Sequence, residues 1–559
     1  MTTGRFFASE TEKRAWTALL LLAALLRVAA LGARPFHHDE SIHAWASNRL
    51  VTEGNYKYDP VYHGPVQYYM VGLAIRIHGL FANPRAMTPG EADAATRLPA
   101  ALGGVALVAL ALLLRPRFGS GAALVAGGLL AVSPDLLYYS RFCREDVWSL
   151  LGTAGGFLFL DAWVRSERLR DLALASLLFS VAFASKENFY VLGALMAPAI
   201  LAAWAEPGRG LDVWNRLRRL IDVLEKRGVA IAGALLLFFN VSILLYTVFL
   251  HHPESGNPVF EAIGYWWGQH KVERVSGPKT YHLPRLLQYE FAILVPAFFR
   301  IFGRWRSLSA VERFLAGWGV SSLVMYAYLG EKTPWLIVHQ VLPFVPLAAT
   351  AWVEGWESGR RWRIAGAAAA AVTVWFSLQL SFVYPAMTPA VPKAESVIYV
   401  QTTPEMLDLR DQILAYGRVG EVPAAIVAGE AGWPMSWYLR RAPVNWEMPK
   451  GDLRPPIVVC DTGQADKAAA ALGAGYVREK DVPFRAWWIP EGSWRPLVPS
   501  VSDLLKYLAT REVWRGNLPP ASNPIGAVSV AVFRRVGPAA PPAAAGPPAA
   551  PPAGAAAPR

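Results

Sequence analysis

The apolar residues of this chain come in blocks, and each block is close to the length of a membrane span. Crossing the hydrocarbon core takes roughly 20 mostly apolar residues. Such stretches recur from Trp16 to Tyr384. Of the 559 residues, 54% are hydrophobic and only 17% are charged, a balance that excludes an ordinary soluble protein of this size. The sequence therefore predicts a multi-pass integral membrane protein.

Arginine clusters between the blocks predict how the chain is threaded. The first block follows Lys13 and Arg14, and because no small-residue cleavage site comes after it, we expect a retained span. With a cytoplasmic N-terminus, every short inner connection is basic, as the positive-inside rule requires. The net charge of +12 then reflects topology and not a nucleic-acid partner. About eleven spans are expected, near 16–33, 98–114, 119–134, 147–164, 172–184, 190–205, 229–250, 286–302, 314–329, 336–353 and 364–384.

The same threading places the chemically interesting residues on the side away from the cytoplasm. The outer segments are 34–97, 135–146, 185–189, 251–285 and 330–335, and they carry the strings HHDES, SRFCRED, SKEN, HHPES and EKTPW. Within the first of them, GPVQYYMVGLAIRIHGLF is apolar but interrupted by Arg76 and His78. Counting it as a span would spoil the charge pattern, so we expect an interfacial or re-entrant helix there.

The composition changes after Tyr384. Short β-rich runs such as SVIYV, AAIVAG and PPIVVC alternate with helical patterns such as PEMLDLRDQILAY and ADKAAAALGA, which indicates an α/β domain. We expect a transmembrane domain over 1–384 with the first outer loop at 34–97, and an outer α/β domain over 385–536. The Ala- and Pro-rich tail, 537–559, is expected to be disordered because it cannot bury a core.

The first outer loop carries an adjacent acidic pair, Asp39 and Glu40. A carboxylate at a membrane surface can serve as a general base, worth roughly 10² to 10⁴ in rate when well placed. The alternative is a helix N-cap at Asp39, because SIHAWASNRL behind it is a helix start. The two roles are compatible. The same loop adds His37, His38, His43, Asp59 and His63.

Cations stand beside carboxylates in three further outer segments. Arg141, Arg144, Glu145 and Asp146 form either a local ion-pair cluster or a phosphate site, since guanidinium groups bind phosphate bidentately. The other candidates in this layer are Lys186 with Glu187 in SKEN, and Lys332 and His339 in EKTPWLIVHQ. Charged groups at such depth are costly unless paired or functional. Histidine and carboxylate side chains also suit a divalent metal, but no ligand spacing such as HExxH appears.

Together these motifs resemble membrane glycosyltransferases of the GT-C class, which include protein O-mannosyltransferases. The strings HHDES, YDPVYHGP, SRFCRED, SKEN, EKTPWLIVHQVLP, ESVIYVQTTPE and GWPMSWYLR are most similar to the flippase-activity-associated family of the Agl type, linked to protein glycosylation. The resemblance runs from about residue 30 to residue 490.

The resemblance implies a helical GT-C fold of about eleven spans with an outward catalytic cavity, in the plasma membrane. It implies a hexosyl- or mannosyltransferase-like enzyme that moves a sugar from a polyprenyl-phosphate donor to a lipid, glycan or protein. Asp39 is then the expected base or acceptor-orienting residue, with Glu40 second. The expected substrate or lipid-phosphate contacts are His38, His63, Arg141, Arg144, Asp146, Lys186, Glu187, Lys332 and His339.

Two observations qualify this resemblance. Oligosaccharyltransferases of the same architecture carry a WWDxG signature, but the nearest string here is AWWIPEG, with Ile489 in place of the Asp. Transfer of a whole oligosaccharide to Asn is therefore disfavoured, and a metal requirement stays open.

The competing functions are a lipid-linked sugar flippase or transport component and a non-catalytic assembly subunit. A transporter should show an internal repeat with broken spans, and the sequence shows neither.

Overall fold

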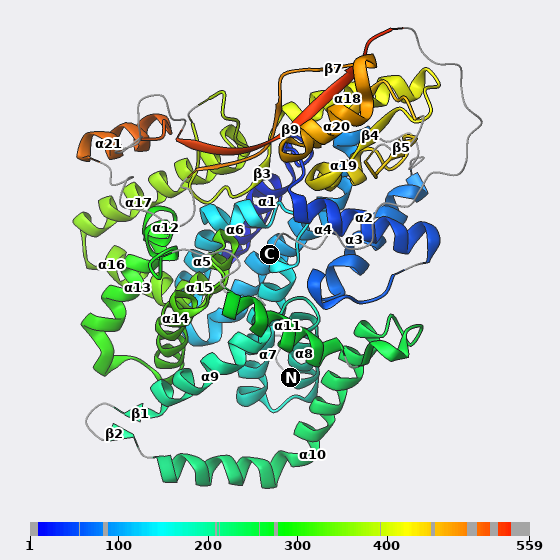
Figure 1. Ribbon diagram of the computed structural model, residues 1–559. Coiled ribbons are helices and arrows are strands. Elements are labelled where there is room, and N and C mark those ends of the chain that lie inside the picture. Colours follow the sequence, from blue (N-terminus) through cyan, green and yellow to red (C-terminus); the bar gives the residue numbers. More distant parts are fainter. Residues whose placement is uncertain are drawn as a thin grey trace. The chain divides into compact units, whose positions relative to one another are not determined.

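A computed structural model describes residues 9–54, 56–81, 88–206, 210–211, 213–256, 258–272, 278–391, 393–448, 453–488, 500–514 and 524–537 (Figure 1). Contacts group the chain into two compact units. The first comprises Met1–Leu31, Leu50–Phe81 and Ala94–Val383, and the second comprises Gly32–Arg49, Ala82–Asp93 and Tyr384–Arg559. Residues 32–49, at the start of the predicted outer loop, therefore group with the C-terminal region. The domain limits expected from the sequence, 1–384 and 385–536, stay a prediction.

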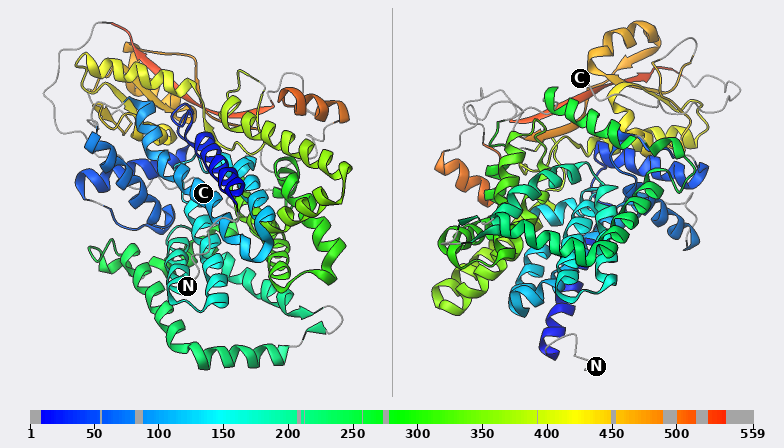
Figure 2. Two further views of the ribbon diagram at one scale, coloured as in Figure 1. Left: turned by 180° about the vertical axis from the view of Figure 1, so that it is seen from behind. Right: turned by 90° about the horizontal axis from the view of Figure 1, so that it is seen from below.

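The first unit is built from helices. They are α1 (Glu10–Val28), α3 (Val66–Phe81), α4 (Pro89–Leu110), α5 (Arg115–Val132), α6 (Pro134–Tyr139), α7 (Asp146–Ser166), α8 (Leu169–Phe183), α9 (Asn188–Trp204), α10 (Val213–Tyr246), α11 (Pro258–Val272), α12 (His282–Tyr289), α13 (Phe291–Arg304), α14 (Ala310–Tyr328), α15 (Ile337–Val341), α16 (Val345–Ser358) and α17 (Arg360–Leu378). The most extensive helix–helix contacts join α7 with α8, α9 with α14 and α13 with α16 (Figure 2). Short β1 (Ala205–Glu206) and β2 (Gly210–Leu211) form a separate two-stranded ladder.

Each predicted span overlaps a helix. Among the described residues, five helices are long and apolar enough to cross a membrane, or six if the bent pair α12 and α13 is one span. The predicted span at 286–302 covers parts of α12 and α13, and the chain bends by 99° between these two helices. Glu290 at that bend accepts hydrogen bonds from the Ser133 hydroxyl and the Asp135 amide.

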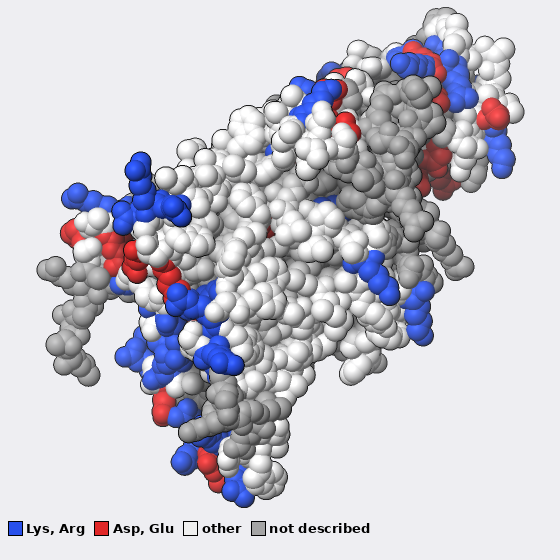
Figure 3. Space-filling model, turned by 90° about the vertical axis from the view of Figure 1, so that its left-hand side faces the viewer, with Lys and Arg blue, Asp and Glu red and all other residues white. Residues whose placement is uncertain are grey.

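The surface of the helical unit shows the pattern expected of a lipid-facing protein. Large apolar side chains stay exposed along α10, α13, α14 and α17, among them Leu236, Phe299, Val324 and Trp375. Figure 3 shows one face of the molecule, where a broad area carries no charged side chain and Lys and Arg gather along its edges. Apolar surface of this kind is stable in hydrocarbon and costly in water. The multi-pass membrane character predicted from the sequence is confirmed.

The second unit contains a mixed sheet, and this confirms the predicted α/β region. The strands are β3 (Gln401–Thr402), β4 (Ala425–Val427), β5 (Val444–Asn445), β6 (Ile457–Asp461), β7 (Tyr476–Arg478), β8 (Val482–Trp488) and β9 (Ile525–Arg535). Their order is β3-β8-β9-β6-β4-β5, with β7 beside β9. Strands β5, β4 and β6 are parallel, and the other pairs are antiparallel.

Helices cover both faces of this sheet. Helices α18 (Glu405–Arg418) and α19 (Gly432–Tyr438) pack on one face, through residues such as Leu409 and Met435, and α20 (Ala465–Leu472) packs on the other. Two further helices complete the unit, α2 (His38–Glu53) and α21 (Val501–Thr510). The chain thus leaves β4 toward one face and β6 toward the other, so the carboxyl ends of these two strands form a topological switch point.

One strand prediction is wrong and one prediction falls outside the described residues. The run SVIYV forms turns, and the strand begins directly after it at Gln401, because the Ile398 amide bonds back to the Glu395 carbonyl. The predicted disordered tail lies outside the described residues from 538 onward.

Candidate functional site

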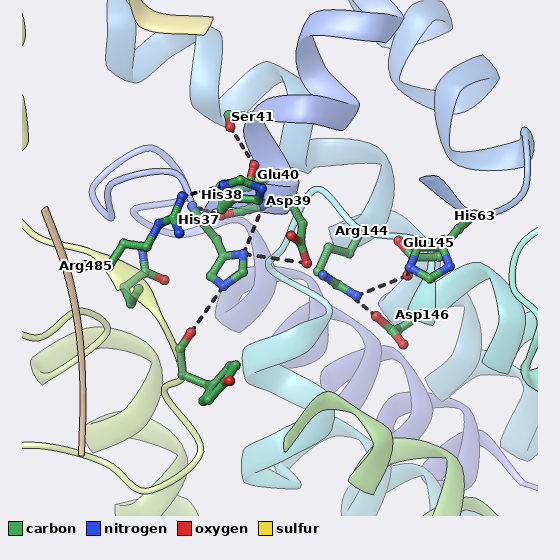
Figure 4. A network of polar contacts seen from close by, with 12 residues as sticks. His37, His38, Asp39, Glu40, Ser41, His63, Arg144, Glu145, Asp146 and Arg485 are labelled. Carbon is green, nitrogen blue, oxygen red and sulfur yellow. Dashed lines mark hydrogen bonds and ion pairs between the residues drawn. The ribbon is translucent and has the colours of Figure 1, made fainter. Parts of the chain in front are cut away.

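Four buried charges in the first unit form one compact network, the ion-pair cluster, and Figure 4 shows three of them, Arg144, Glu145 and Asp146. The Lys186 ammonium lies 2.9 Å from Glu145 Oε1 and 2.6 Å from Asp146 Oδ1. The Arg144 guanidinium lies 3.2 Å from Glu145 Oε1 and 3.1 Å from Asp146 Oδ2. All four residues are at most 4% exposed. Two cations thus face two anions, an arrangement that offsets the cost of burying them.

Three further side chains extend the ion-pair cluster. His63 Nδ1 lies 2.6 Å from Glu187 Oε2, and His63 Nε2 lies 3.5 Å from Glu145 Oε1. His339 Nε2 lies 3.2 Å from Asp146 Oδ1. The structure therefore brings together His63, Arg144, Asp146, Lys186, Glu187 and His339, all of which the sequence singles out.

Burial and neighbouring carboxylates act in opposite directions on two of these groups. Burial alone lowers the pKa of Lys186, but Asp146 and Glu145 raise it by more, so its pKa stands above the usual 10.5. Burial also lowers the pKa of His63, while Glu145 and Glu187 raise it to a net value above 6.5. The carboxylates thus favour the cationic form of both groups.

The ion-pair cluster forms where two helices begin. Asp146 is the first residue of α7, and SKEN forms the turn between α8 and α9 that carries Lys186. An acidic side chain is favourable at a helix N-terminus, because the unpaired amides there carry partial positive charge. The contributing residues come from four separate polar segments of the sequence, which the threading places at one end of the bundle.

A pocket of about 290 Å³ opens beside the ion-pair cluster. His63, Lys186 and Glu187 line one side of it, and Glu331 also reaches it. Its aromatic lining consists of Tyr190, Trp266, Trp267, Tyr326 and Trp335. Trp266 stacks on the His63 ring at 4.9 Å, and Trp335 lies 4.2 Å from the Arg144 guanidinium. The pocket therefore combines charged groups with aromatic surface.

Two predicted phosphate ligands have backbone partners. The Lys332 ammonium donates to the carbonyls of Tyr326, Ala327 and Leu329, at the C-terminal end of α14. The Arg141 guanidinium donates to the carbonyls of Leu26, Arg27 and Ala30, at the end of α1. Each cation thus binds the unpaired carbonyls of a helix end, where positive charge is stabilising.

The two adjacent carboxylates of the first outer loop have different surroundings (Figure 4). Glu40 is fully buried, lies 3.0 Å from the Arg34 guanidinium and accepts the His37 amide at 3.0 Å. The Asp39 side chain is 31% exposed. The alternative that Asp39 is the N-cap is wrong, because α2 begins at His38 and Asp39 lies inside its first turn. Glu40 bonds back to the residue before the helix, as in one half of a capping box.

His37 is held in one neutral tautomer by its contacts. Its Nε2 lies 3.1 Å from the Tyr399 carbonyl, which can only accept. Its Nδ1 accepts the Asp39 amide at 3.2 Å. A proton on Nδ1 would face that amide, so these contacts favour the tautomer that is protonated on Nε2, with the Asp39 carboxylate 3.8 Å from Nδ1.

Segment 34–40, which we call the first-loop segment, is tied to the α/β part of its own unit. The Arg34 guanidinium donates to Gln401 Oε1 at 2.8 Å, and Gln401 Nε2 donates to the Pro35 carbonyl at 2.9 Å. The Phe36 amide donates to the Tyr438 hydroxyl at 2.8 Å, and that hydroxyl lies 3.1 Å from Asp93 Oδ2.

Arg485 on β8 reaches the predicted site residue His38. Its guanidinium lies 2.8 Å from His38 Nδ1 and 3.2 Å from Glu430 Oε2. A β-bulge between Pro483 and Arg485 shifts the strand register at this point, and bulges redirect side chains in this way. Glu430 follows β4 at the switch point, where its amide donates to Asp461 Oδ1 at 2.9 Å. Gly429 is required in this turn, because φ is +80° and a Cβ would lie 2.2 Å from that carboxylate.

Sequence reasoning missed Arg485, Tyr438 and Gln401 as partners of the first-loop segment. The segment lies more than 360 residues from each of them in sequence. No motif marks such pairs.

The described residues contain no group of three or more His, Cys, Asp or Glu side chains that would hold a metal ion. The position of Ile489, where oligosaccharyltransferases have their Asp, lies outside the described residues.

Comparisons with known proteins agree on the fold. A family model described as dolichyl-phosphate-mannose-protein mannosyltransferase matches residues 63–248. The structure of ArnT from Cupriavidus metallidurans bound to undecaprenyl phosphate matches with a TM-score of 0.57 and 16% identity, over 82% of this chain and 95% of that one. The apo structure of the same protein matches with a TM-score of 0.56 and 14% identity, over 81% and 94% of the two chains. No curated protein matches. The GT-C fold predicted from the motifs is confirmed.

Proposed function

We propose that this chain, a membrane glycosyltransferase of the GT-C class, moves a single sugar from a polyprenyl-phosphate donor to an acceptor on the non-cytoplasmic face of the membrane. The acceptor is a lipid, a glycan or a protein. The matched family acts with dolichyl-phosphate-mannose, and the similar ArnT structure holds undecaprenyl phosphate. Both names include a polyprenyl-type lipid phosphate.

The pocket beside the ion-pair cluster is the observation that carries this proposal. Sugar rings present C–H faces that stack on aromatic side chains, and Tyr190, Trp266 and Trp335 supply such surface. Lys186 and His63 line the same pocket and supply positive charge for a phosphate. A volume of about 290 Å³ suits a single sugar with its phosphate.

Lys186 is the cation that we assign to the donor phosphate, with Arg144 behind it. Both are already paired with Glu145 and Asp146, so the phosphate has to compete with carboxylates. Pairing keeps the cations in place before the donor arrives, and a fixed charge needs no reorganisation during the reaction. Glu187 and His339 hold the neighbouring groups, while Arg141 and Lys332 fix helix ends.

Asp39 is the carboxylate that we assign to the acceptor. It takes the proton of the attacking hydroxyl, whose oxygen forms the new bond to the anomeric carbon. The bond from that carbon to the phosphate oxygen breaks, and its electron pair leaves with the polyprenyl phosphate. Glu40 does not suit this role, since it is fully buried and its charge is paired with Arg34.

The outward orientation rests on which charged segments meet. Charged residues at or near the predicted inner ends of the spans pair with one another, as Arg115 does with Glu12, Arg117 with Asp161 and Arg300 with Glu312. Predicted outer residues meet in the ion-pair cluster. Since cytoplasmic connections are the basic ones, we propose that the pocket faces away from the cytoplasm of the plasma membrane.

The test is sugar transfer by the full chain reconstituted in vesicles with radiolabelled polyprenyl-phosphate mannose or glucose. Wild type should transfer the label to extracted lipid or protein acceptors, and Asp39→Asn should not. Asp466→Asn, on the exposed side of α20, is the matched control for loss of one carboxylate. Equal transfer by Asp39→Asn and wild type would contradict the role of Asp39. Donor movement across the bilayer without transfer would support a flippase instead.

A further inference from the structure

A second apolar groove lies at the opposite end of the helical unit, between α8 and α10. Its volume is about 580 Å³. The residues that line its apolar part are Leu169, Leu172, Ala173, Val229, Ala230, Gly233, Ala234 and Leu237. The glycosyl-transfer site uses none of them.

Two hydrogen bonds join α8 and α10 at one end of the groove. The Ser176 hydroxyl donates to the Ala234 carbonyl, and the Ser180 hydroxyl donates to the Phe238 carbonyl at 3.1 Å. A Cβ built on Gly233 would meet no atom within 4 Å, so this part of α10 faces open space. The groove is therefore open at Gly233, on the kind of surface where a membrane protein contacts acyl chains.

Basic side chains lie at the end of the groove away from the Ser176 and Ser180 hydrogen bonds. Lys226 and Arg227 line it together with Trp163 and Glu167. Arg227 pairs with Glu167 and lies 5.6 Å over the Trp163 ring. Within the described part of the chain, Lys226 has no carboxylate partner and its side chain is exposed. A positive charge is therefore open to an incoming anion directly beside apolar wall.

The first half of α10 continues this surface. A 34-residue helix is roughly 50 Å long, well beyond the roughly 30 Å of hydrocarbon, and α10 bends between its two halves (Figures 1 and 2). Residues 213–228 contain five basic and two acidic residues. Their exposed apolar side chains recur at helical spacing, at Trp214, Leu217, Leu220, Ile221 and Leu224. This combination is typical of a helix that lies at an anionic membrane surface.

We propose that the groove between α8 and α10 binds an anionic phospholipid of the membrane. One acyl chain lies against the apolar walls, and the phosphate binds Lys226 and Arg227. The charge favours this ligand over a zwitterionic lipid, whose choline would be repelled by the same two side chains. The position at the basic end of the bundle separates this lipid from the donor of the glycosyl-transfer reaction.

Native mass spectrometry of the detergent-purified full chain tests the proposal with phosphatidylglycerol, phosphatidylcholine and polyprenyl phosphate added in turn. Each basic side chain near an anionic lipid contributes about fivefold in binding. The double variant Lys226→Gln/Arg227→Gln should therefore bind phosphatidylglycerol about 20-fold more weakly. Gly233→Phe fills the groove and should lose the lipid while leaving both charges in place. Arg306→Gln removes an exposed charge from another predicted inner connection and serves as the control.

The proposal is supported if phosphatidylglycerol adducts disappear in both groove variants and persist in the control. It is overturned if phosphatidylcholine binds as well as phosphatidylglycerol, or if the double variant keeps its adducts. Polyprenyl phosphate that displaces phosphatidylglycerol at equal concentration would also overturn it, because the groove would then be a donor site. A single symmetric peak in size-exclusion chromatography shows that each variant is folded.

Discussion

The ion-pair cluster in the helical unit and the first-loop segment in the α/β unit differ in how far their charged side chains are buried and paired. In the ion-pair cluster, Lys186 and Arg144 are matched by Glu145 and Asp146, and every member is buried. In the first-loop segment, Glu40 is buried and paired with Arg34. Asp39 next to it keeps 31% of its side chain exposed.

The difference separates charges that are buried and paired from a carboxylate that is partly exposed. A buried charge without its partner is costly, so the ion-pair cluster tolerates little change. An accessible carboxylate pays no such cost and is available to take a proton. The comparison predicts that substitutions in the ion-pair cluster affect stability first, whereas Asp39 affects turnover alone.

The largest effect on stability is expected for Lys186→Met. The change leaves Glu145 and Asp146 buried without their nearest cation, which costs about 3 to 5 kcal/mol. Thermal unfolding in detergent measures it. Lys467→Met, on the exposed side of α20, is the control and should change stability by less than about 0.5 kcal/mol. A loss below about 1 kcal/mol for Lys186→Met would break the comparison.

Glu40→Gln is expected to cost less, about 2 to 3 kcal/mol. The amide keeps the shape of the side chain but loses the charged contacts with Arg34 and the His37 amide. Arg34 keeps its bond to Gln401, which limits the damage. Denaturant unfolding of the full chain in detergent measures the loss. If Asp39→Asn destabilised the protein as much as Glu40→Gln, the two carboxylates would not differ as proposed.

Tyr438→Phe tests how firmly the first-loop segment is held. The Tyr438 hydroxyl accepts the Phe36 amide and contacts the Asp93 carboxylate. Its removal leaves a buried amide with one contact fewer and should cost about 1 to 2 kcal/mol. Hydrogen exchange at the Phe36 amide should accelerate. Unchanged exchange would show that other contacts hold this segment.

The smallest effect concerns His63 and pH. Because the folded-state pKa of His63 is raised above 6.5, its stabilising contribution is fully present below pH 6.5. The contribution is lost as the pH rises through the folded-state pKa, since the charge facing Glu145 and Glu187 disappears. Between pH 5 and 9, the melting temperature of wild type should decrease as the pH rises through the folded-state pKa of His63. The decrease should be weaker for His63→Gln. Identical pH profiles would contradict a charged His63.

Apolar block length and Arg placement were sufficient to locate the helices and the polar residues that meet at one end. His63, Asp146, Lys186 and His339 come together because helix ends on the same side of a bundle are neighbours. The bend at Glu290 could not be predicted, since it depends on a bond to Ser133. Nor could the contact of Arg485 with His38, because a β-bulge directs that side chain.

Lys332 illustrates a different limit of prediction from residue type. Its segment, EKTPW, marks a charged group at the end of a span, and the sequence predicts a phosphate ligand there. The ammonium binds three carbonyls at the end of α14, and its role as a phosphate ligand stays a prediction. A cation at a helix C-terminus satisfies both local hydrogen bonding and the helix dipole, and residue type alone does not distinguish this from ligand binding.

The most direct test compares sugar transfer by Asp39→Asn and Glu40→Gln, expressed per folded molecule, at saturating donor. The account predicts a loss of roughly 10² to 10⁴ in turnover for Asp39→Asn with an unchanged melting temperature. It predicts a lowered melting temperature for Glu40→Gln, with less than a tenfold loss of turnover in the folded fraction. Turnover above a tenth of wild type for Asp39→Asn, or an equal loss in both variants, would contradict the assignment of Asp39 as the base.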